Sequence, residues 1–242
     1  MSEQFIFKRY EIKYQITKQQ FAIIKQAMQE HMIPDEHGKS TICSLYFDTP
    51  DDILVRRSIQ SPPYKEKLRL RSYGVANADT LVFIEIKKKY DSIVYKRRVC
   101  MTYREAVDYL YHNKPVMDTQ ITREIDYLRQ LYVGIRPAVL LTYDREAYYD
   151  KDDHEFRMTF DDHVLYRTNH LELDKGIYGT PILDDDLVLM EVKVAEAMPL
   201  WLVKVLSENK IYKSSFSKFG TAYKKICEAK TQKENGGIYQ YA

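Results

Sequence analysis

Cysteines and long apolar runs are both scarce in this sequence. Its 242 residues include only three cysteines, Cys43, Cys100 and Cys227, which lie far apart and lack the spacing of a metal site. This usage indicates reduced thiols and argues against a disulfide framework. No run of about 18 apolar residues, which a membrane helix needs, is present, and the first residues lack a signal-peptide core. We therefore expect a cytoplasmic protein without a transmembrane segment.

An excess of one charge is also missing. Lysine and arginine number 37 against 35 aspartates and glutamates, which gives a formal net charge of +2. This near balance provides no general attraction to nucleic acid or to an anionic membrane. Neither G-x-x-x-x-G-K-S/T nor G-x-G-x-x-G occurs, so the familiar glycine-rich phosphate loops are absent. A site for an anion would have to be built locally from side chains.

Linkers rich in glycine and serine are absent as well. The chain is 45% hydrophobic and 30% charged, which is ordinary for a folded globular protein. We expect residues 1–229 to form a single domain. Residues 230–242 are largely polar and are predicted to be a disordered tail.

What the sequence does contain is period-two alternation of apolar and polar residues, which predicts β-strands. Capping boxes at Thr17 and Thr102 predict the first turns of two helices, and further helices are expected near residues 121–128, 199–205 and 216–229. About eight long antiparallel strands must pair into a sandwich or close into a barrel, because open edges promote aggregation. The predicted strands are residues 5–16, 41–48, 64–73, 81–88, 93–101, 137–149, 155–161, 164–173 and 187–194.

One face of each long strand is charged. In YKEKLRLRSY (Tyr64–Tyr73), Lys65, Lys67, Arg69 and Arg71 share one face and the leucines lie on the other. For a single strand, a face in contact with water is the simpler interpretation. Across the whole set, however, arginine and lysine predominate at mid-strand and carboxylates are sparse. This bias favours a common cationic surface.

A barrel would bring these cationic faces together. If the apolar faces point outward beneath helices, the cations line the bore, and eight strands leave room for one slim ligand. Unpaired cations cannot be dried out inside a protein, because each costs several kcal/mol. Water or an anion must therefore fill the space. A chain of phosphates fits best, since arginine offers a bidentate fork and lysine a compact point charge.

Ten short motifs follow one another along the chain. This succession resembles the VTC domain, the polyphosphate polymerase branch of the triphosphate tunnel metalloenzymes, which are related to CYTH proteins. The resemblance covers most of residues 5–229 and implies an α+β fold, an antiparallel eight-stranded barrel with helices packed outside. The motifs are RYEIKY (Arg9–Tyr14), SLYFDTP (Ser44–Pro50), KLRLRSYG (Lys67–Gly74), FIEIKKK (Phe83–Lys89), VYKRR (Val94–Arg98), YDREAY (Tyr143–Tyr148), FRMTFD (Phe156–Asp161), LMEVKV (Leu189–Val194), PLWL (Pro199–Leu202) and FSKF (Phe216–Phe219).

The resemblance also implies an activity and a set of residues. A VTC domain would transfer the γ-phosphoryl group of ATP to a growing polyphosphate chain, with Mn²⁺ or Mg²⁺ as cofactor. Catalysis would depend on Arg69, Arg71, Lys87, Arg157 and Glu191. Glu191 would be the main metal ligand, with Glu85 and Glu11 as further candidates. The phosphates would be bound by Lys13, Arg69, Arg71, Lys87, Lys96, Arg145, Arg157, Lys193, Lys213 and Lys218.

Two departures from the family pattern leave alternatives open. Hydrolytic relatives carry E-x-E-x-K on the first strand, whereas this chain has Arg9, Glu11 and Lys13, which favours the polymerase. A phosphohydrolase of tripolyphosphate or nucleoside triphosphates and a non-catalytic polyphosphate-binding module are the alternatives. The SPX sensor and membrane helices of the eukaryotic polymerases have no counterpart in this sequence. Inositol phosphate regulation and export across a membrane are therefore not carried over, and whether a membrane protein is a partner stays open.

The role of Asp161 is open at this stage. Its strand parity places it beside Arg157, where it either orients the guanidinium group or assists the metal. His154 and His163 follow pairs of aspartates but fit no zinc pattern, so turn and strand-end positions are the simpler interpretation. Candidates for contact with a nucleobase are Tyr46, Tyr73 and Tyr143.

Overall fold

The computed structural model describes residues 10–91 and 93–236, apart from the side chains of residues 37 and 233–236. These residues form one ten-stranded sheet in which neighbouring strands are antiparallel. The strand predicted over residues 5–16 is seen from Tyr10 onward, and residues 5–9 lie outside the described part. The strands are β1 (Tyr10–Thr17), β2 (Met32–Asp48), β3 (Tyr64–Tyr73), β4 (Leu81–Tyr90), β5 (Ile93–Thr102), β6 (Arg136–Asp150), β7 (Arg157–Arg167), β8 (Thr180–Pro181), β9 (Leu187–Val194) and β10 (Lys213–Ser214).

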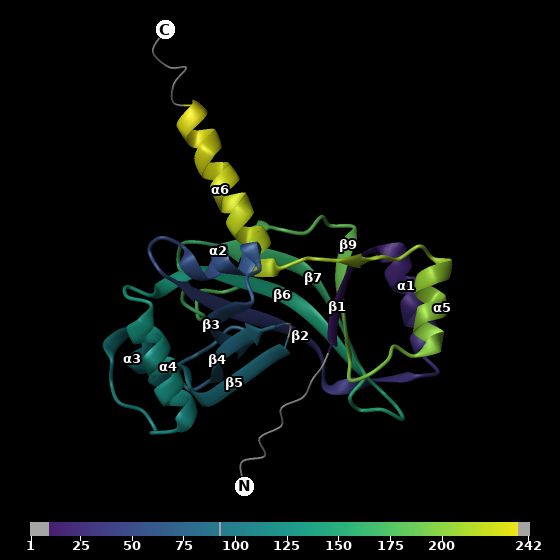
Figure 1. Cartoon of the computed structure of the whole chain (residues 1–242), viewed down its shortest axis with the longest axis horizontal. Helices are drawn as coiled ribbons and strands as arrows, with labels where there is room; N and C mark the ends of the chain where they lie inside the picture. Colours follow the sequence, from purple (N-terminus) through teal and green to yellow (C-terminus); the bar gives the residue numbers. More distant parts are fainter. Residues whose placement is uncertain (1–9, 92, 237–242) are drawn as a thin grey trace.

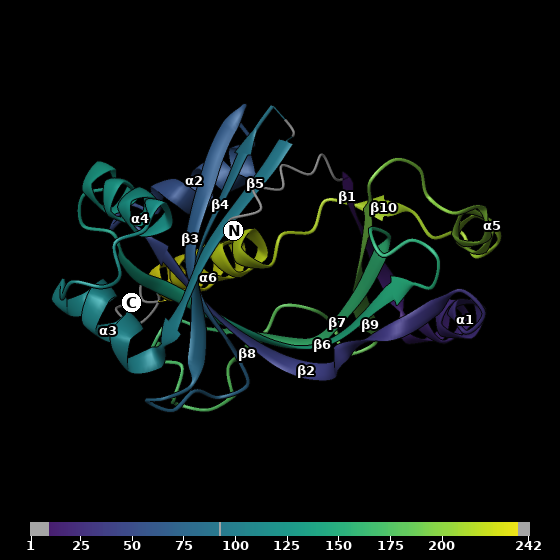
Figure 2. The same cartoon turned by 90° about the horizontal axis from the view of Figure 1, so that it is seen from below.

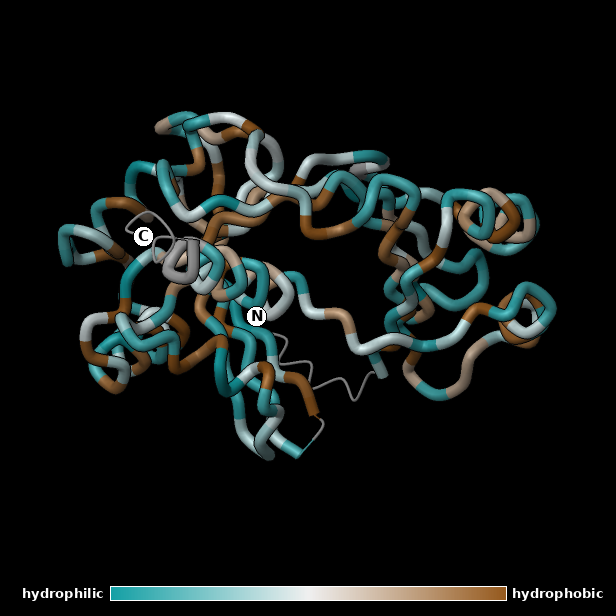
Figure 3. Tube along the Cα trace, turned by 90° about the horizontal axis from the view of Figure 1, so that it is seen from above, coloured by the Kyte–Doolittle hydropathy of each residue, from teal (hydrophilic) through white to brown (hydrophobic). Residues whose placement is uncertain are grey.

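Helices cover the outer faces of the sheet. α1 and α5 pack together beside β1 and β9 at one end, and α3 and α4 cover β4 and β5 at the other (Figure 1). Figure 3 shows hydrophobic segments on the helices at both ends. None of the helices in the described part is both long and apolar enough to cross a membrane. The helices are α1 (Lys18–Met28), α2 (Ile53–Gln60), α3 (Tyr103–His112), α4 (Gln120–Leu131), α5 (Leu200–Glu208) and α6 (Lys218–Gly236).

The sheet is strongly curved and open on one side. Its strand order is β10-β1-β9-β7-β6-β2-β3-β4-β5, with β8 beside β7. Figure 2 shows β3, β4 and β5 as one wall, β2 and β6 as the floor, and β7, β9 and β1 as the opposite wall. The α+β class and the large antiparallel sheet are confirmed. Closure into the predicted eight-stranded barrel is not detected, because within the described residues β5 and β10 do not pair with each other.

Polar contacts, rather than a strand ladder, span the gap between the two walls. β10 pairs with β1 over only two residues, and the chain then enters α6, so none of the strands in the described part lies between β10 and β5. Lys87 on β4 forms an ion pair with Glu11 on β1, with 3.1 Å between Nζ and Oε2. Lys13 on β1 donates from Nζ to the Phe216 carbonyl at 3.2 Å, in the segment that leads to α6.

Alternation along the strands sends apolar side chains outward beneath the helices. On β3, Leu68 and Leu70 are fully buried in a cluster that includes residues of α3 and α4. On β9, Met190 and Val192 are equally buried beside α1 and α5. The hydrophobic effect therefore fixes which face of each strand is turned outward, and the charged faces are left on the concave side.

The predicted amino-terminal ends of the helices agree with the structure, whereas α6 ends later than predicted. The capping boxes at Thr17 and Thr102 are both present, and Thr119 forms a third one with Thr122. α6 continues to Gly236, so residues 230–236 of the predicted tail are helical in the structure. That stretch is rich in lysine, glutamine and glutamate, which are good helix formers. Residues 237–242 lie outside the described part, and a single domain over residues 1–229 stays a prediction.

Candidate active site

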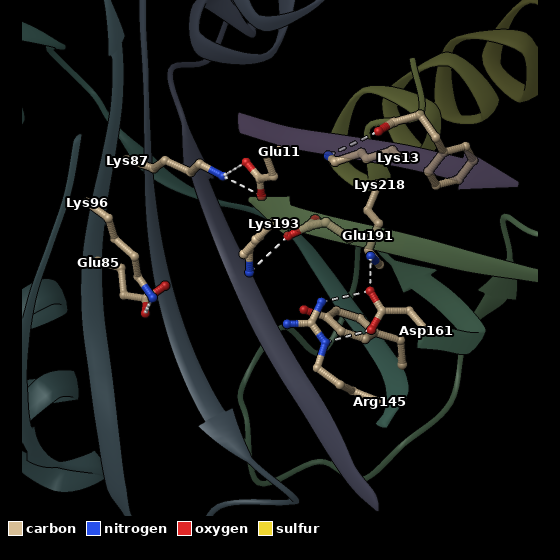
Figure 4. Close-up of polar contacts among 12 residues, drawn as sticks. Glu11, Lys13, Glu85, Lys87, Lys96, Arg145, Asp161, Glu191, Lys193 and Lys218 are labelled. Carbon is tan, nitrogen blue, oxygen red and sulfur yellow. Dashed lines mark hydrogen bonds and ion pairs between the residues drawn. The ribbon is translucent and has the colours of Figure 1, made fainter. Parts of the chain in front are cut away.

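A cavity of about 800 Å³ lies in the concave side of the sheet. Its lining includes eleven lysines and arginines but only four aspartates and glutamates. We call it the arginine cavity, because five arginines line it: Arg69, Arg71, Arg98, Arg145 and Arg157. Figure 4 shows that its charged side chains come from both walls and point toward one another. The expectation that the cationic strand faces converge on a common space is met.

A second cavity of about 1200 Å³ adjoins the first. The two share Lys13, Lys67 and Lys87 in their linings, so they form a continuous passage. Seven lysines and no arginine line the second cavity, which we call the lysine cavity. Of the residues expected to bind phosphate, Lys213 lies in the lysine cavity rather than in the arginine cavity.

Glu85 holds two cations on one wall of the arginine cavity. Its Oε2 accepts from Arg69 Nε at 2.5 Å, and its Oε1 lies 2.6 Å from Lys96 Nζ. Burial alone would raise the pKa of this carboxyl, but Arg69, Arg71 and Lys96 lower it to about 2. Both oxygens of Glu85 are therefore engaged by cations. This geometry suits an anchor for Arg69 and Lys96 better than the expected role as a metal ligand.

Asp161 holds two further cations on the opposite wall. Arg145 donates to both carboxylate oxygens, Nε to Oδ1 at 2.6 Å and Nη2 to Oδ2 at 2.8 Å. Lys218 at the start of α6 also donates to Oδ2 (Figure 4). Asp161 is fully buried, and although burial opposes ionisation, Lys218 and Arg145 lower the pKa of its carboxyl. Arg157, which one of the two roles considered for Asp161 would have it orient, is exposed and instead donates to the His154 carbonyl at 3.3 Å.

Two glutamates meet between β1 and β9. Glu11 and Glu191 lie in diagonal positions on these paired strands, and their carboxyl groups are in contact. Burial alone would raise the pKa of Glu191, but Lys193, the contact with Glu11, Lys13 and Arg145 lower it well below its usual range. Carboxyl oxygens placed side by side in this way are the ligands that Mg²⁺ and Mn²⁺ prefer. Lys193 Nζ lies 3.0 Å from Glu191 Oε1, and Lys87 Nζ donates to both oxygens of Glu11. A divalent cation held by this pair would therefore replace these lysine contacts.

Two tyrosines position the arginines of β3. Arg69 donates from Nη1 to the Tyr46 hydroxyl at 3.1 Å, and Arg71 donates from Nη2 to the Tyr143 hydroxyl at 3.0 Å. Arg71 also donates from Nε to Ser44 Oγ at 3.2 Å. These hydroxyls hold guanidinium groups, which differs from the nucleobase contact considered from the sequence. Arginines fixed in this way lose less entropy when they bind a phosphate.

We expect Tyr46 to ionise near neutral pH. Burial alone would raise the pKa of its hydroxyl, but Arg69, Lys67 and Arg71 lower it to about 7. Because the folded-state pKa is below the unfolded value of 10.0, this group adds stability as the pH rises from about 7 to 10, and that stability is lost as the pH falls through 7. The measurement is phenolate absorbance against pH.

The wild type should show a phenolate step near pH 7 that is absent from Tyr46→Phe and retained in Tyr10→Phe, a change at an exposed position. Bound tripolyphosphate should move the step to higher pH, because it neutralises the neighbouring cations. A wild-type titration without this step would contradict the assignment.

Residues 8–227 match the family model of the VTC domain. The chain belongs to the VTC domain family. VTC domains bind triphosphate ligands, which agrees with the cation-lined passage found here. No curated protein sequence matches the chain.

The VTC domain is similar in fold to solved structures of low sequence identity. One is a "putative adenylate cyclase" from Bacillus halodurans, with a TM-score of 0.53 and 15% identity over 86% of this chain and 92% of the other. A "putative adenylyl cyclase" from Hippeastrum with a dominant triphosphatase activity has a TM-score of 0.48 and 14% identity over 86% and 92% of the two chains. The first likeness shows the shared CYTH-like fold and nothing about the reaction.

A second acidic group of the VTC domain lies outside both cavities. Asp144, Asp162 and His163 place ligand atoms within 4.8 Å of one another, an arrangement consistent with divalent metal binding. Strand parity turns Asp144 and Asp162 away from the cavity that Arg145 lines. Thr41 Oγ1 donates to Asp144 Oδ1 at 2.7 Å. Hydrogen bonds at the surface are therefore a second explanation of why these side chains lie together. His163 has a positive φ of 47° and sits beside a bulge between β6 and β7.

The sequence did not identify several residues of the passage as site residues. Lys67 and Arg98 line the arginine cavity, and Lys65, Lys89 and Lys224 line the lysine cavity. The parity that selected Arg69 and Arg71 on β3 also selects Lys65 and Lys67, so their signal was present. Lys224 lies on α6, and nothing in the strand pattern places that helix at the passage.

Proposed function

We propose that this VTC domain is a metal-dependent polyphosphate polymerase that transfers the γ-phosphoryl group of ATP to the end of a growing polyphosphate chain. The observation that supports it most is the convergence of eleven lysines and arginines from both walls on one cavity, next to the paired carboxylates of Glu11 and Glu191. A passage of this kind suits a slim linear anion, since a folded nucleic acid or a protein surface cannot enter it.

In the proposed reaction, the side chains bind and align phosphates. Arg69 and Arg71 on one wall, and Arg145 on the other, present guanidinium forks to phosphate oxygens. A terminal oxygen of the polyphosphate chain forms a bond to the γ-phosphorus, the bond from that phosphorus to the bridging oxygen breaks, and ADP leaves with the electron pair. A divalent cation held by Glu191 and Glu11 would neutralise charge on the transferred group.

Positioning and charge stabilisation account for the catalysis in this proposal. Phosphoryl transfer needs little covalent chemistry from the protein, and preorganised cations in a sheltered site stabilise the developing charge. Glu85 and Asp161 keep four of these cations in place before the substrate arrives. No side-chain nucleophile is required.

The experiment that tests the proposal shows whether polyphosphate or water accepts the phosphoryl group. Purified protein is incubated with ATP and Mn²⁺, and the products are resolved by size. Long phosphate polymers and ADP are expected. Orthophosphate as the only phosphate product would show that water is the acceptor and that the protein is a phosphohydrolase. Tight ATP binding without turnover would show a binding module. Either of these two results would contradict the polymerase proposal.

A further inference from the structure

The proposed elongation reaction needs a polyphosphate end as acceptor, and the first transfer therefore needs another nucleophile. Serine, threonine and tyrosine side chains line the arginine cavity, among them Tyr46 and Tyr143. Tyrosine forms covalent intermediates in enzymes when its oxygen is activated by a lowered pKa or a neighbouring base. Both of these tyrosines already contact arginines that are proposed to bind phosphate.

The Tyr46 hydroxyl lies beside a proposed phosphate-binding group. Tyr46 on β2 is directly opposite Arg69 on β3, and its hydroxyl accepts from Arg69 Nη1 at 3.1 Å. Glu85 occupies Nε of the same guanidinium group. A phosphate oxygen bound at the remaining N–H groups would lie within about 5 Å of the tyrosine oxygen, since each is about 3 Å from a nitrogen of the fork. Bound phosphate and hydroxyl are therefore neighbours.

The Tyr46 ring is held in one orientation. It stacks on Phe219 of α6, with the ring centroids 4.6 Å apart and the planes inclined by 18°. Tyr46 is only 8% exposed, and the part of it that lines a cavity faces the arginine cavity. A nucleophile fixed beside the reacting group needs no further ordering, which lowers the barrier to transfer.

The cations around Tyr46 can compensate a phosphate ester formed there. Lys67 and Arg71 flank Arg69 on the same face of β3 and line the same cavity. In the part of the chain that the structure describes, neither of them has a carboxylate partner. Lys67 donates to Ser217 Oγ at 3.5 Å, and Arg71 donates to hydroxyl oxygens. Cations of this kind form strong hydrogen bonds to a phosphotyrosine.

Tyr143 is the natural comparison in the same cavity. Its hydroxyl accepts from Arg71 at 3.0 Å, but the other cations beside it are paired with Asp161. Burial alone would raise the pKa of both tyrosines. Neighbouring cations lower it to about 7 at Tyr46, whereas at Tyr143 the Asp161 carboxylate opposes the lowering. Because the deprotonated oxygen is the stronger nucleophile, Tyr46 is the better acceptor.

We propose that Tyr46 accepts the first phosphoryl group from ATP and that the resulting phosphotyrosine is the primer from which a polyphosphate chain grows. This inference rests on the proposed transfer from ATP and adds a first acceptor to it. The Tyr46 oxygen forms a bond to the γ-phosphorus and the bond from that phosphorus to the bridging oxygen breaks. ADP leaves with the electron pair, and the hydroxyl proton passes to solvent. A terminal oxygen of the phosphotyrosine then accepts the next γ-phosphoryl group.

The first test looks for the phosphotyrosine directly. The full chain is incubated with equimolar ATP and Mn²⁺, without polyphosphate, and the reaction is stopped with acid. Acid hydrolyses phosphoanhydride bonds and spares the tyrosine ester, so a chain that has grown is cut back to one phosphoryl group. Peptide mass spectrometry then locates the group. Wild type and Tyr143→Phe should carry it on Tyr46, and Tyr46→Phe should carry none.

The second test asks whether the phosphotyrosine starts the chain. The rate of polymer synthesis from ATP is measured with and without added long-chain sodium polyphosphate. Primed rates should fall in both Tyr46→Phe and Tyr143→Phe, since each loses a hydroxyl that holds an arginine, and the ratio of unprimed to primed rate removes this effect. That ratio should fall by about tenfold or more in Tyr46→Phe, because an acceptor free in solution replaces a positioned one. Tyr143→Phe should keep the wild-type ratio, and melting temperatures confirm that both variants are folded.

Polymer made by wild type from ATP alone, without a phosphoryl group on Tyr46, would overturn the primer and leave the proposed function intact. An equal unprimed-to-primed ratio in Tyr46→Phe and wild type would overturn it as well, and so would phosphorylation of Tyr143 in place of Tyr46. Failure of wild type to lengthen added polyphosphate would count against the proposed function instead. In that case a phosphoryl group on Tyr46 would still support its role as an acceptor.

Discussion

Glu191→Gln is expected to reduce polyphosphate synthesis from ATP by about a thousandfold or more, because a metal ion at this position contributes several kcal/mol to the transition state. The substitution keeps the shape of the side chain and removes its charge. Glu191 is in contact with Glu11, and one neutral partner weakens any divalent site between them. The measurement is the rate of ADP release with saturating ATP and Mn²⁺.

A measurement of tripolyphosphate binding distinguishes loss of the metal from loss of the fold in Glu191→Gln. Removal of a carboxylate leaves Lys193 and the neighbouring cations with less compensation. Glu191→Gln should therefore bind tripolyphosphate at least as tightly as wild type when no metal is present. Glu208→Gln, at an exposed position on α5, is the control for both measurements. Turnover within a few-fold of wild type in Glu191→Gln would remove the metal assignment.

Asp161→Asn is expected to lower the free energy of unfolding by about 3 kcal/mol, since it leaves Arg145 and Lys218 side by side without their carboxylate. This value is at the low end for a broken buried pair, because the cavity side leaves the two cations 17% and 13% exposed. Chemical denaturation at neutral pH measures the loss. Asp162→Asn, on the adjacent residue of the outer face, is the matched control and should change stability by less than about 0.5 kcal/mol.

The pH dependence of the Asp161 effect has a definite sign. The pKa of this carboxyl is lowered from its ordinary value of 3.8, so its stabilisation is fully present above that value. It is lost as the pH falls through the lowered folded-state pKa. The difference between wild type and Asp161→Asn should therefore shrink below about pH 4. Tripolyphosphate should stabilise the variant more than wild type, and equal stabilisation would contradict the placement of Arg145 and Lys218 at the phosphate site.

Strand parity was sufficient to predict which residues face the passage. Because side chains alternate along a strand, the buried leucines of β3 force Arg69 and Arg71 to the concave side. The same reasoning correctly placed Lys87 and Glu191. Together with the ordered motifs, it predicted the family and the large antiparallel sheet. Whether these side chains have the roles implied by the resemblance stays a prediction.

Long-range partners could not be predicted in this way. Parity gives the face of a strand and not the curvature of the sheet, so it does not tell a closed barrel from an open one. Parity offered only Arg157, on the same strand, as a cation for Asp161 to orient, with assistance to the metal as the alternative. The structure instead gives it Arg145 on β6 and Lys218 on α6, which lies 57 residues away. That contact depends on where α6 enters the cavity, and the helix pattern alone carries no such information.

A crystal structure of the protein with bound tripolyphosphate is the most direct measurement of the central claim. The phosphates are predicted to lie in the arginine cavity, with oxygens in contact with Arg71 on β3 and with Arg145 or Lys218 on the opposite wall. Phosphates bound on the outer surface, while the arginine cavity holds only solvent, would contradict the account.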